Sequence, residues 1–559
     1  MRGKQAEETT MDMKEKLAAV IRAAAERGIA DGVFPEAELP AVELEVPPKK
    51  EMGDFATNFA MKSAKAFRKS PRQIAEALSE RFARDGVERV EIAGPGFINF
   101  YLAKDVIYDG LRAAAAAGED YGNLPKKDAP RTQVEYVSAN PTGPLHVGHG
   151  RGAAVGSALV NLLRAAGYDV EAEYYINDAG NQIDHLAESV NARYLQLCGQ
   201  DVEVPEDGYR GRDIVETARR IKEKDGDKYL SMPEAERLAI FKERALAEKL
   251  AALKEDLAAF NVHYDVWFSE RTLHPDKVNA AVEKLRANGN IYEKDGALWL
   301  RSTDYGDDKD RVVIRAGGEP TYLAADIAYH KDKFERGFGR VINLWGADHH
   351  GYICRVKAAI KALGGNPDHL TVMLLQMVSL LRGGEAVKMS KRTGESVTLA
   401  ELIEEVGTDA ARYFFVMRSP DSQLDFDIDL AKSQSSENPV YYVQYAHARI
   451  KSVFRQAEET GLKESGAFDL LTDESELDLI KKIEEYPREV EKAAADLAPQ
   501  RIARVAHEMA GAFHSFYSRC RIMGVEPKLA GARLALAGKT AQVIRHALHI
   551  LGVSAPEKM

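Results

Sequence analysis

The stretch Val134-Glu-Tyr-Val-Ser-Ala-Asn-Pro-Thr-Gly-Pro-Leu-His-Val-Gly-His149 decides the fold, because it runs from an apolar strand through a turn-rich loop into a helix. We expect the strand at 134–137 and the helix from about Gly150, with Gly167 at its end. A second apolar strand, 341–345, is followed by another expected helix that closes at Gly364 and Gly365. Strands that alternate with helices in this way indicate a parallel, doubly wound α/β sheet.

The rest of the chain divides into regions with different sequence patterns. Residues 1–122 look α+β, with strands expected at 42–46, 90–92 and 97–101. The charged stretch at about 184–273 is expected to be a helical insertion between the two halves of the sheet, and the pattern from about Leu399 onward is almost entirely helical. We therefore expect four parts: an N-terminal α+β domain (1–122), the α/β domain (123–398), a helical connector (399–435) and a C-terminal all-helical domain (436–559).

Composition is that of an ordinary globular protein. Its 559 residues suit three or four domains at about 100–200 residues each. The most apolar stretch, 372–381, is far shorter than the roughly 20 residues of a membrane span, and Lys4, Glu7 and Glu8 stand where an export signal needs an apolar core. The three cysteines are far apart and form no CxxC pair. We therefore expect a cytoplasmic protein without disulfides or a structural metal site.

The formal net charge of −11 argues mildly against a nucleic-acid partner, but the distribution of charge does not. Between Arg501 and Met559 there are nine basic residues against three acidic ones. Because phosphate attraction depends on the local field, a basic terminal unit of an acidic protein can still bind RNA. Solvated helix faces explain this charge pattern equally well.

Two histidines mark the point where the first helix begins. His146 and His149 stand three residues apart, with Gly148 between them. A helix N-terminus attracts phosphate through free N–H groups and its dipole, imidazoles add donors, and glycine lets a nucleotide approach the backbone. Alone, this HxGH pattern more often reflects chance, or ordinary buried and surface histidines.

A second basic motif, Lys388-Met-Ser-Lys-Arg392, stands far downstream in a loop flanked by glycines. Two lysines on such a loop can neutralise a triphosphate as pyrophosphate leaves, a reaction that depends on positioning and electrostatics. Alone, the stretch could be any solvated basic turn. The HVGH turn at a first strand–helix junction, combined with KMSKR after a late strand of the same sheet, is a strong joint signal for nucleotide chemistry.

These two strings resemble the HIGH and KMSKS signatures of class I aminoacyl-tRNA synthetases, with Val147 in place of isoleucine and Arg392 in place of serine. The segment Trp345-Gly-Ala-Asp-His-His-Gly351 resembles the nucleotide-binding strand end between them. The resemblance implies a Rossmann-type sheet, an aminoacyl-adenylate made from ATP with Mg²⁺ on the phosphates, and transfer of the aminoacyl group to tRNA. By matching position, it implies catalytic roles for His146, His149, Lys388 and Lys391, and ATP binding by His146, Gly148, His149, Gly346, Asp348, His349, Met389, Ser390 and Lys391.

Carboxylates near the expected ends of the strands suggest a cationic substrate. Glu135 closes the first strand, and Asp326 follows Tyr322 by four residues. A guanidinium has five donors and a permanent charge, so two carboxylates and a tyrosyl oxygen suit it, and Asn140 could hold an α-amino group. In the alternative interpretation, Glu135 and Asp326 merely pair with nearby lysines or cap helices, and the residues alone favour that alternative.

The family resemblance favours the substrate-binding interpretation, because the chain resembles the arginyl branch of the class over nearly its whole length. The motifs that carry this resemblance are 134–149, 177–182, 322–326 and 438–449, with 53–58 and 93–99 matching an extra N-terminal domain. It implies L-arginine bound by Glu135, Asn140, Tyr322 and Asp326. It also implies an N-terminal domain on the tRNA elbow, a monomer, and a C-terminal anticodon-binding domain that contacts tRNA through Tyr441, Tyr445 and Arg449.

Two alternatives stay open at this point. Another class I specificity is disfavoured, because cysteinyl enzymes need zinc ligands that this sequence lacks and a glutamyl pocket needs cations where Glu135 and Asp326 stand. A non-catalytic tRNA-binding paralogue is disfavoured, because a binding protein has no use for a pyrophosphate clamp. The expected reaction is therefore ATP-dependent ligation of L-arginine to tRNA through an arginyl-adenylate.

Overall fold

The computed structural model describes residues 13–387 and 396–559, which form two compact units. The first unit comprises the residues up to Gly118 together with 462–484 and 520–536, and the second comprises 119–461, 485–519 and 537–559. None of the described helices combines the length and the apolarity needed to cross a membrane.

The first unit is built on an antiparallel sheet with strand order β1-β3-β2, packed with helices. Its N-terminal elements are α1 (Met13–Ala30), η1 (Lys50–Met52), β1 (Phe55–Thr57), α2 (Phe59–Phe67), α3 (Pro71–Ser79), β2 (Val87–Ala93), β3 (Phe97–Leu102) and α4 (Lys104–Ala117). The expected strand at 42–46 is wrong, because that range contributes a single bridge between Glu45 and Ala56. The short β1, which the sequence did not reveal, pairs with β3 instead.

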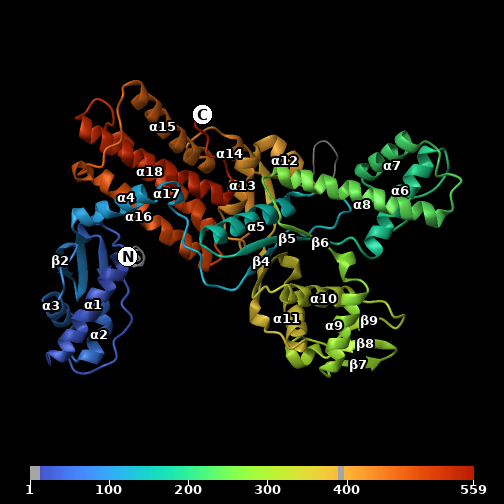
Figure 1. Ribbon diagram of the computed structural model, residues 1–559, viewed down its shortest axis with the longest axis horizontal. Coiled ribbons are helices and arrows are strands. Elements are labelled where there is room, and N and C mark those ends of the chain that lie inside the picture. Colours follow the sequence, from blue (N-terminus) through green and yellow to red (C-terminus); the bar gives the residue numbers. More distant parts are fainter. Residues whose placement is uncertain (1–12, 388–395) are drawn as a thin grey trace, which may run out of the picture. The chain divides into compact units, whose positions relative to one another are not determined.

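The second unit contains the expected doubly wound sheet, five parallel strands in the order β11-β10-β4-β5-β6 (Figure 1). The strands are β4 (Thr132–Glu135), β5 (Val170–Ile176), β6 (Val266–Ser269), β10 (Arg340–Gly346) and β11 (Leu370–Leu375). The chain runs outward from β4 through β5 to β6, and then returns to place β10 on the other side of β4. The order therefore reverses between β4 and β10, where doubly wound sheets bind their ligands.

The helical insertion is shorter than expected. Helices α6 (Asn181–Leu197), α7 (Arg212–Asp225) and α8 (Glu234–Ala259) form their own apolar cluster, which includes Tyr194, Ile214 and Phe241. Figure 1 shows these three helices as a group at one end of the second unit. The expected boundary near residue 273 is wrong, because β6 follows α8 and pairs with β5 in the central sheet.

Two small sheets accompany the central one. One is an antiparallel sheet made of β7 (Ile291–Lys294), β8 (Ala297–Leu300) and β9 (Arg311–Ile314). The helices of the same part of the chain are η3 (Glu270–Leu273), α9 (Asp276–Ala287), η4 (Ser302–Tyr305), α10 (Tyr322–Glu335), η5 (Ala347–His349), α11 (Tyr352–Ala362) and η6 (Pro367–His369). The other sheet has the order β13-β12-β14 and comprises β12 (Val378–Arg382), β13 (Glu385–Val387) and β14 (Leu424–Asp427). The strands before the KMSKR motif thus belong to a separate sheet, which corrects the expectation of a strand in the central one.

Helix α5 (Val147–Ala165) packs unusually close to the segment that follows β4. A Cβ atom added at Gly156 would lie 2.2 Å from the Tyr136 ring, so only glycine allows this approach. Both sides of the contact are buried, and Tyr136 is 1 % exposed. The glycine therefore fixes the distance between the helix and the edge of the sheet where ligands bind.

We predict that Gly156→Ala lowers the free energy of unfolding by about 1–3 kcal/mol, because the added methyl overpacks a buried contact. Gly152→Ala is the matched control on the same helix, since its Cβ would meet Leu375 at an ordinary 3.5 Å. Alanine at that position should leave stability unchanged or raise it by up to about 1 kcal/mol. Urea unfolding of both variants checks this, and equal stabilities would contradict the close packing.

The remaining helices complete the two units. They are η2 (Gly118–Asp120), α12 (Leu399–Val406), α13 (Thr408–Val416), α14 (Ile428–Lys432), α15 (Pro439–Glu459), η7 (Phe468–Leu470), α16 (Glu474–Ala495), α17 (Gln500–Arg519) and α18 (Pro527–Leu551). The presence of β14 shows that the region after Leu399 is not wholly helical, although helices dominate it.

A buried arginine joins several helices of the second unit. Arg412 of α13 is 0 % exposed and donates to the carbonyls of Phe260, at the end of α8, and Leu551, at the end of α18. It also donates to the hydroxyl of Ser157 on α5 at 2.6 Å. Burial lowers the pKa of Arg412 to about 10, which still leaves it charged at neutral pH. The carboxyl ends of two helix dipoles stabilise this cation.

Candidate active site

The first turn of α5 is capped by its own histidines. The His146 side chain accepts a hydrogen bond from the Gly148 backbone N–H at 3.1 Å, and His149 Nδ1 accepts from the His146 N–H at 3.3 Å. This reciprocal arrangement is a capping box built from imidazoles. The two rings stack with their centroids 3.7 Å apart. The expected helix start therefore moves three residues earlier than Gly150, to Val147.

The caps determine the protonation of both rings. Each Nδ1 accepts a hydrogen bond, so each neutral imidazole carries its proton on Nε2. Partial burial lowers the pKa of both rings, and His149, next to His146, reaches about 4. At neutral pH the turn therefore presents N–H donors from neutral rings beside the positive end of the helix dipole. A Cβ on Gly148 would lie 3.0 Å from the His146 ring, so the glycine also leaves room for the cap.

The chain that follows the KMSKR motif is bound to this same turn. The Val147 N–H donates to the Val397 carbonyl at 3.3 Å, and the Leu399 N–H donates to the Leu145 carbonyl at 2.8 Å. His146 and Thr398 form an antiparallel bridge. The predicted residues Lys388, Met389, Ser390 and Lys391 lie outside the described residues.

The predicted nucleotide residues after β10 lie at the same edge of the sheet. Strand β10 pairs in parallel with β4, with Asn343 opposite Glu135, the last residue of β4. Gly346, the last residue of β10, therefore lies just beyond the edge of the sheet at which β4 ends. Asp348 and His349 continue this edge in the single turn η5. Both line a cleft of about 690 Å³, whose wall also contains Tyr352 and Arg355.

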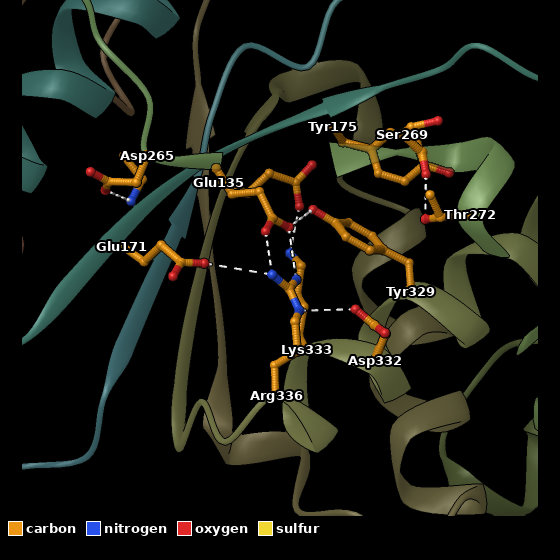
Figure 2. A network of polar contacts seen from close by, with 12 residues as sticks. Glu135, Glu171, Tyr175, Asp265, Ser269, Thr272, Tyr329, Asp332, Lys333 and Arg336 are labelled. Carbon is orange, nitrogen blue, oxygen red and sulfur yellow. Dashed lines mark hydrogen bonds and ion pairs between the residues drawn. The ribbon is translucent and has the colours of Figure 1, made fainter. Parts of the chain in front are cut away.

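Glu135 lies in a buried ion pair rather than alone. The Lys333 ammonium donates to Glu135 Oε2 at 2.6 Å (Figure 2), and the Ser138 hydroxyl donates to Oε1 at 3.0 Å. Lys333 is 0 % exposed, and Glu135 is 7 % exposed. The pairing with lysine that the sequence left open as an alternative is therefore present. Each carboxylate oxygen still has lone pairs for a further donor.

Asp326 lies near the same carboxylate. Its side chain accepts a hydrogen bond from the Tyr352 hydroxyl. Burial, together with the negative charges of Glu135 and Glu270, raises the pKa of Asp326 to about 7, against the opposing effect of the Tyr352 hydrogen bond. A carboxyl group that is costly to ionise in the empty protein is suited to receive a cation.

The other two predicted arginine-binding residues are more exposed. Tyr322, at the start of α10, is 55 % exposed. Asn140 is exposed in the loop after β4, where its side chain lies 3.1 Å from the Asn177 amide. The loop leaves β4 through Val137 and Ser138, both with positive φ, at 69° and 43°. Such strain in a β-branched residue is typical of functional loops.

Sequence reasoning missed Glu270. This residue directly follows β6, is 5 % exposed and contacts the His274 ring at 3.2 Å. Burial raises the pKa of Glu270. Its position after a strand was the available signal, but that strand lay inside the range expected to be a helical insertion. Glu135, Asp326 and Glu270 therefore form a group of three carboxylates.

The predicted tRNA-binding residues lie together on α15. The rings of Tyr441 and Tyr445 stack with centroids 6.1 Å apart, and the Arg449 side chain donates to the Tyr445 hydroxyl. The Arg449 guanidinium also lies 5.9 Å from the centroid of the Tyr517 ring. The Tyr441, Tyr445 and Arg449 side chains are half-buried, and a partly accessible arrangement of rings and a guanidinium is suited to stacking on unpaired bases.

Comparisons with known proteins agree with this geometry. Three family models match: the arginyl tRNA synthetase N-terminal domain at 11–102, the class I (R) tRNA synthetase catalytic domain at 119–421, and the DALR anticodon binding domain at 443–559. The arginine–tRNA ligase of Carboxydothermus hydrogenoformans is 55 % identical over 96 % of this chain and 97 % of that protein. The corresponding ligase of Heliobacterium modesticaldum is 54 % identical over 93 % and 94 %. The solved structure of Thermus thermophilus arginyl-tRNA synthetase shares the fold, with a TM-score of 0.74 and 23 % identity over 98 % of this chain and 100 % of that chain.

A doubly wound sheet, a histidine-capped helix at its reversal point and a matching catalytic-domain model define a class I aminoacyl-tRNA synthetase. The expected fold class is thereby confirmed. Within that class, the chain belongs to the arginine–tRNA ligase family. Its reaction is the ATP-dependent ligation of arginine to tRNA, which decides against the cysteinyl, glutamyl and non-catalytic alternatives.

Proposed function

We propose that arginine and ATP react at the carboxyl edge of the five-stranded sheet, between the first turn of α5 and the carboxylates of Glu135 and Asp326. The convergence of three carboxylates at this edge carries the proposal. Carboxylates crowded in low dielectric are costly unless a cation joins them, and the guanidinium of arginine is such a cation. The neighbouring helix N-terminus is suited to the triphosphate.

In this arrangement the guanidinium binds Glu135, Tyr322 and Asp326, with Glu270 adding negative charge, and Asn140 holds the α-amino group. The free carboxylate of arginine is already a nucleophile, so the first step needs no general base. It attacks the α-phosphorus of ATP, forming the arginyl-adenylate and releasing pyrophosphate. The aminoacyl group then passes to the terminal ribose of tRNA, with release of AMP.

ATP binding is assigned to two sets of residues. The HVGH turn (His146, Gly148, His149) and the end of β10 (Gly346, Asp348, His349) hold the nucleotide, together with Met389, Ser390 and Lys391. Lys388 and Lys391 stabilise charge on the departing pyrophosphate. Mg²⁺ enters with ATP as the counter-ion of its phosphates. Support comes from the hydrogen bonds that hold 397–399 against the HVGH turn, because they bring the end of the KMSKR loop towards α5.

The tRNA spans several parts of the chain. Tyr441, Tyr445 and Arg449 contact the anticodon side, and the N-terminal domain, 1–122, contacts the elbow. The boundaries proposed for the other parts are 123–398 for catalysis, 399–435 for the connector and 436–559 for the anticodon domain. We further propose a monomer that works in the cytoplasm, which light scattering and cell fractionation can test. Three free cysteines suit a reducing compartment.

Amino-acid-dependent pyrophosphate exchange with tRNA present tests the proposed chemistry. Arginine should support exchange, whereas lysine, citrulline and glutamate should support little or none. Citrulline is the sharpest comparison, because it keeps the shape of arginine and lacks its charge. Activation of another amino acid in clear preference to arginine would contradict the proposal.

The double role of His146 gives a prediction that separates folding from catalysis. His146→Ala removes both the helix cap and the imidazole, so stability should fall by about 1 kcal/mol and kcat should also fall. His146→Asn supplies a good N-cap without the imidazole, so stability should stay near that of the native protein while kcat falls by roughly 10²-fold. Thermal unfolding and aminoacylation kinetics measure the two effects. Full activity in the asparagine variant would show that the imidazole acts only as a cap.

A further inference from the structure

The buried pair of Glu135 and Lys333 belongs to a longer chain of hydrogen bonds. The Lys333 ammonium donates to Asn343 Oδ1 at 3.0 Å, as well as to Glu135. Asn343 Nδ2 in turn lies 3.1 Å from His330 Nε2, and His330 Nδ1 lies 2.8 Å from the Asp326 carbonyl oxygen. The chain therefore connects the two carboxylate residues of the proposed arginine pocket through three buried side chains.

The chain has a single possible direction. The carbonyl of Asp326 can only accept, so His330 carries its proton on Nδ1 and accepts at Nε2 from the Asn343 amide. The amide oxygen of Asn343 then faces Lys333, whose ammonium can only donate. Burial, reinforced by the charge of Lys333, lowers the pKa of His330 to about 3, which agrees with a neutral ring. The Lys333 ammonium at one end thus orients every donor in this chain of hydrogen bonds.

The position of the cation matters because the pocket is crowded with negative charge. The Lys333 ammonium lies 2.6 Å from Glu135 and offsets one negative charge in this group of carboxylates. A second network next to it shows the same pairing, because Arg336 bonds both oxygens of the fully buried Glu173 at 2.6 and 3.0 Å. Figure 2 shows Lys333 and Arg336 within one network of polar contacts.

We propose that Lys333 is a positioning residue for arginine recognition, a resident countercharge that holds the buried Glu135 carboxylate in its orientation before the substrate arrives. The inference rests on the proposed arginine pocket and extends it by a residue that does not touch substrate. The Glu135 carboxylate is then already oriented to accept hydrogen bonds from the guanidinium of arginine. Asn343 fixes the Lys333 ammonium in place, and the same chain of hydrogen bonds reaches the backbone carbonyl of Asp326 through His330.

Proton release on arginine binding separates this role from a merely structural one. The titratable groups that face Glu135 and Lys333 from the packed elements are Tyr175 on β5, Tyr264 before β6, and Asp326, Tyr329 and His330 on α10. The pKa values of the three tyrosines are raised and that of His330 is lowered, so Asp326 is the one of these five that titrates between about pH 6 and 9. At about pH 8.5 native protein should therefore release few protons.

The test is calorimetric titration of the full-length protein with arginine at about pH 8.5, in buffers of different ionisation enthalpy. Lys333→Met keeps the length of the side chain and removes its charge. We expect its arginine affinity to fall roughly 10- to 100-fold, the factor for one hydrogen bond to a charged group. Binding should also release up to one additional proton. The KM for ATP should change by less than about twofold, because the nucleotide does not meet Lys333.

Three further variants make the outcome decisive. Lys333→Arg retains the cation and should restore most of the affinity. Lys331→Met removes a partly exposed lysine of the same helix, paired with Glu335 at 2.6 Å, and should behave like native protein. Asn343→Leu keeps the ion pair of Lys333 with Glu135 but removes the hydrogen bond that fixes the ammonium, and it should raise the arginine KM several-fold. This variant serves as the test if Lys333→Met does not fold.

The inference would be overturned if Lys333→Met bound arginine with native affinity and native proton release. If Lys333→Met cannot be purified, a native arginine KM in Asn343→Leu would overturn it. Failure of the pocket itself would look different. If the proposed pocket is wrong, Asp326→Asn would also bind arginine normally. If only the role of Lys333 is wrong, Asp326→Asn would still weaken arginine binding.

Discussion

Replacing Asp326 with asparagine is expected to weaken arginine binding by roughly 10²–10³-fold, while the KM for ATP stays nearly constant. The substitution keeps the shape of the side chain and its hydrogen bond with Tyr352, but it removes one of the pocket charges. Binding of a guanidinium in low dielectric depends on that charge. Isothermal titration with arginine and steady-state aminoacylation kinetics measure the effect.

Asp332→Asn is the control for helix α10. Asp332 lies six residues further along the helix and forms ion pairs with Lys277 and Arg336 at 2.5 and 2.9 Å, outside the group of three carboxylates. This control should cost stability and leave arginine affinity within about threefold. Normal arginine binding by the Asp326 variant would remove that residue from the proposed pocket.

The same carboxyl group predicts how arginine affinity depends on pH. Because the pKa of Asp326 is raised to about 7, the empty pocket takes up a proton as the pH falls through neutrality. The protonated form is uncharged and binds a guanidinium poorly. Arginine affinity should therefore level off above about pH 8 and fall by up to about tenfold per pH unit below 7. The Asp326→Asn variant should lose this dependence.

Replacing Lys391 with alanine is the second prediction of large effect, with kcat expected to fall roughly 10²–10³-fold and arginine affinity to change little. The assigned role is to neutralise charge that develops as pyrophosphate leaves, so the residue contributes in the transition state and not in the binding of the amino acid. Single-turnover measurements of adenylate formation isolate this step. Arg392→Ser is the control, because it restores the serine of the more usual signature and should keep most of the activity. An unchanged rate in Lys391→Ala would refute the role.

Local patterns in the sequence were sufficient for the central fold. The strand before Val137 and the helix after His146 follow from apolar periodicity and turn residues within a few positions of each other. Strand β6 was missed because it is four residues long and follows a long charged helix, so its short apolar pattern was read as part of the insertion. The expected strand at 42–46 has the right composition but finds a single bridge, since strand formation depends on a partner.

The residues of the candidate site could be proposed from the sequence, but most of the contacts between them could not. Gly346, Asp348 and the HVGH turn could be identified because the motif itself contains the helix start and the strand end. The pairing of Glu135 with Lys333 joins residues 198 positions apart, and no local pattern encodes it. Glu270 was missed for a related reason, because its closeness to Asp326 arises only when β6 joins the sheet.

The contacts of Arg412 and its neighbours give the segment 551–556 a structural role. The final residues supply acceptors to the interior, namely the Leu551 carbonyl to Arg412, the Ser554 carbonyl to Gln444 and the Pro556 carbonyl to His447. Removal of these residues would take one acceptor away from the buried Arg412 guanidinium and leave the Gln444 and His447 side chains without their carbonyl partners. The interior of the second unit therefore depends on acceptors from a segment that follows every proposed substrate-binding residue. A variant truncated before Leu551 should be less stable than the native protein, although it contains all of those residues.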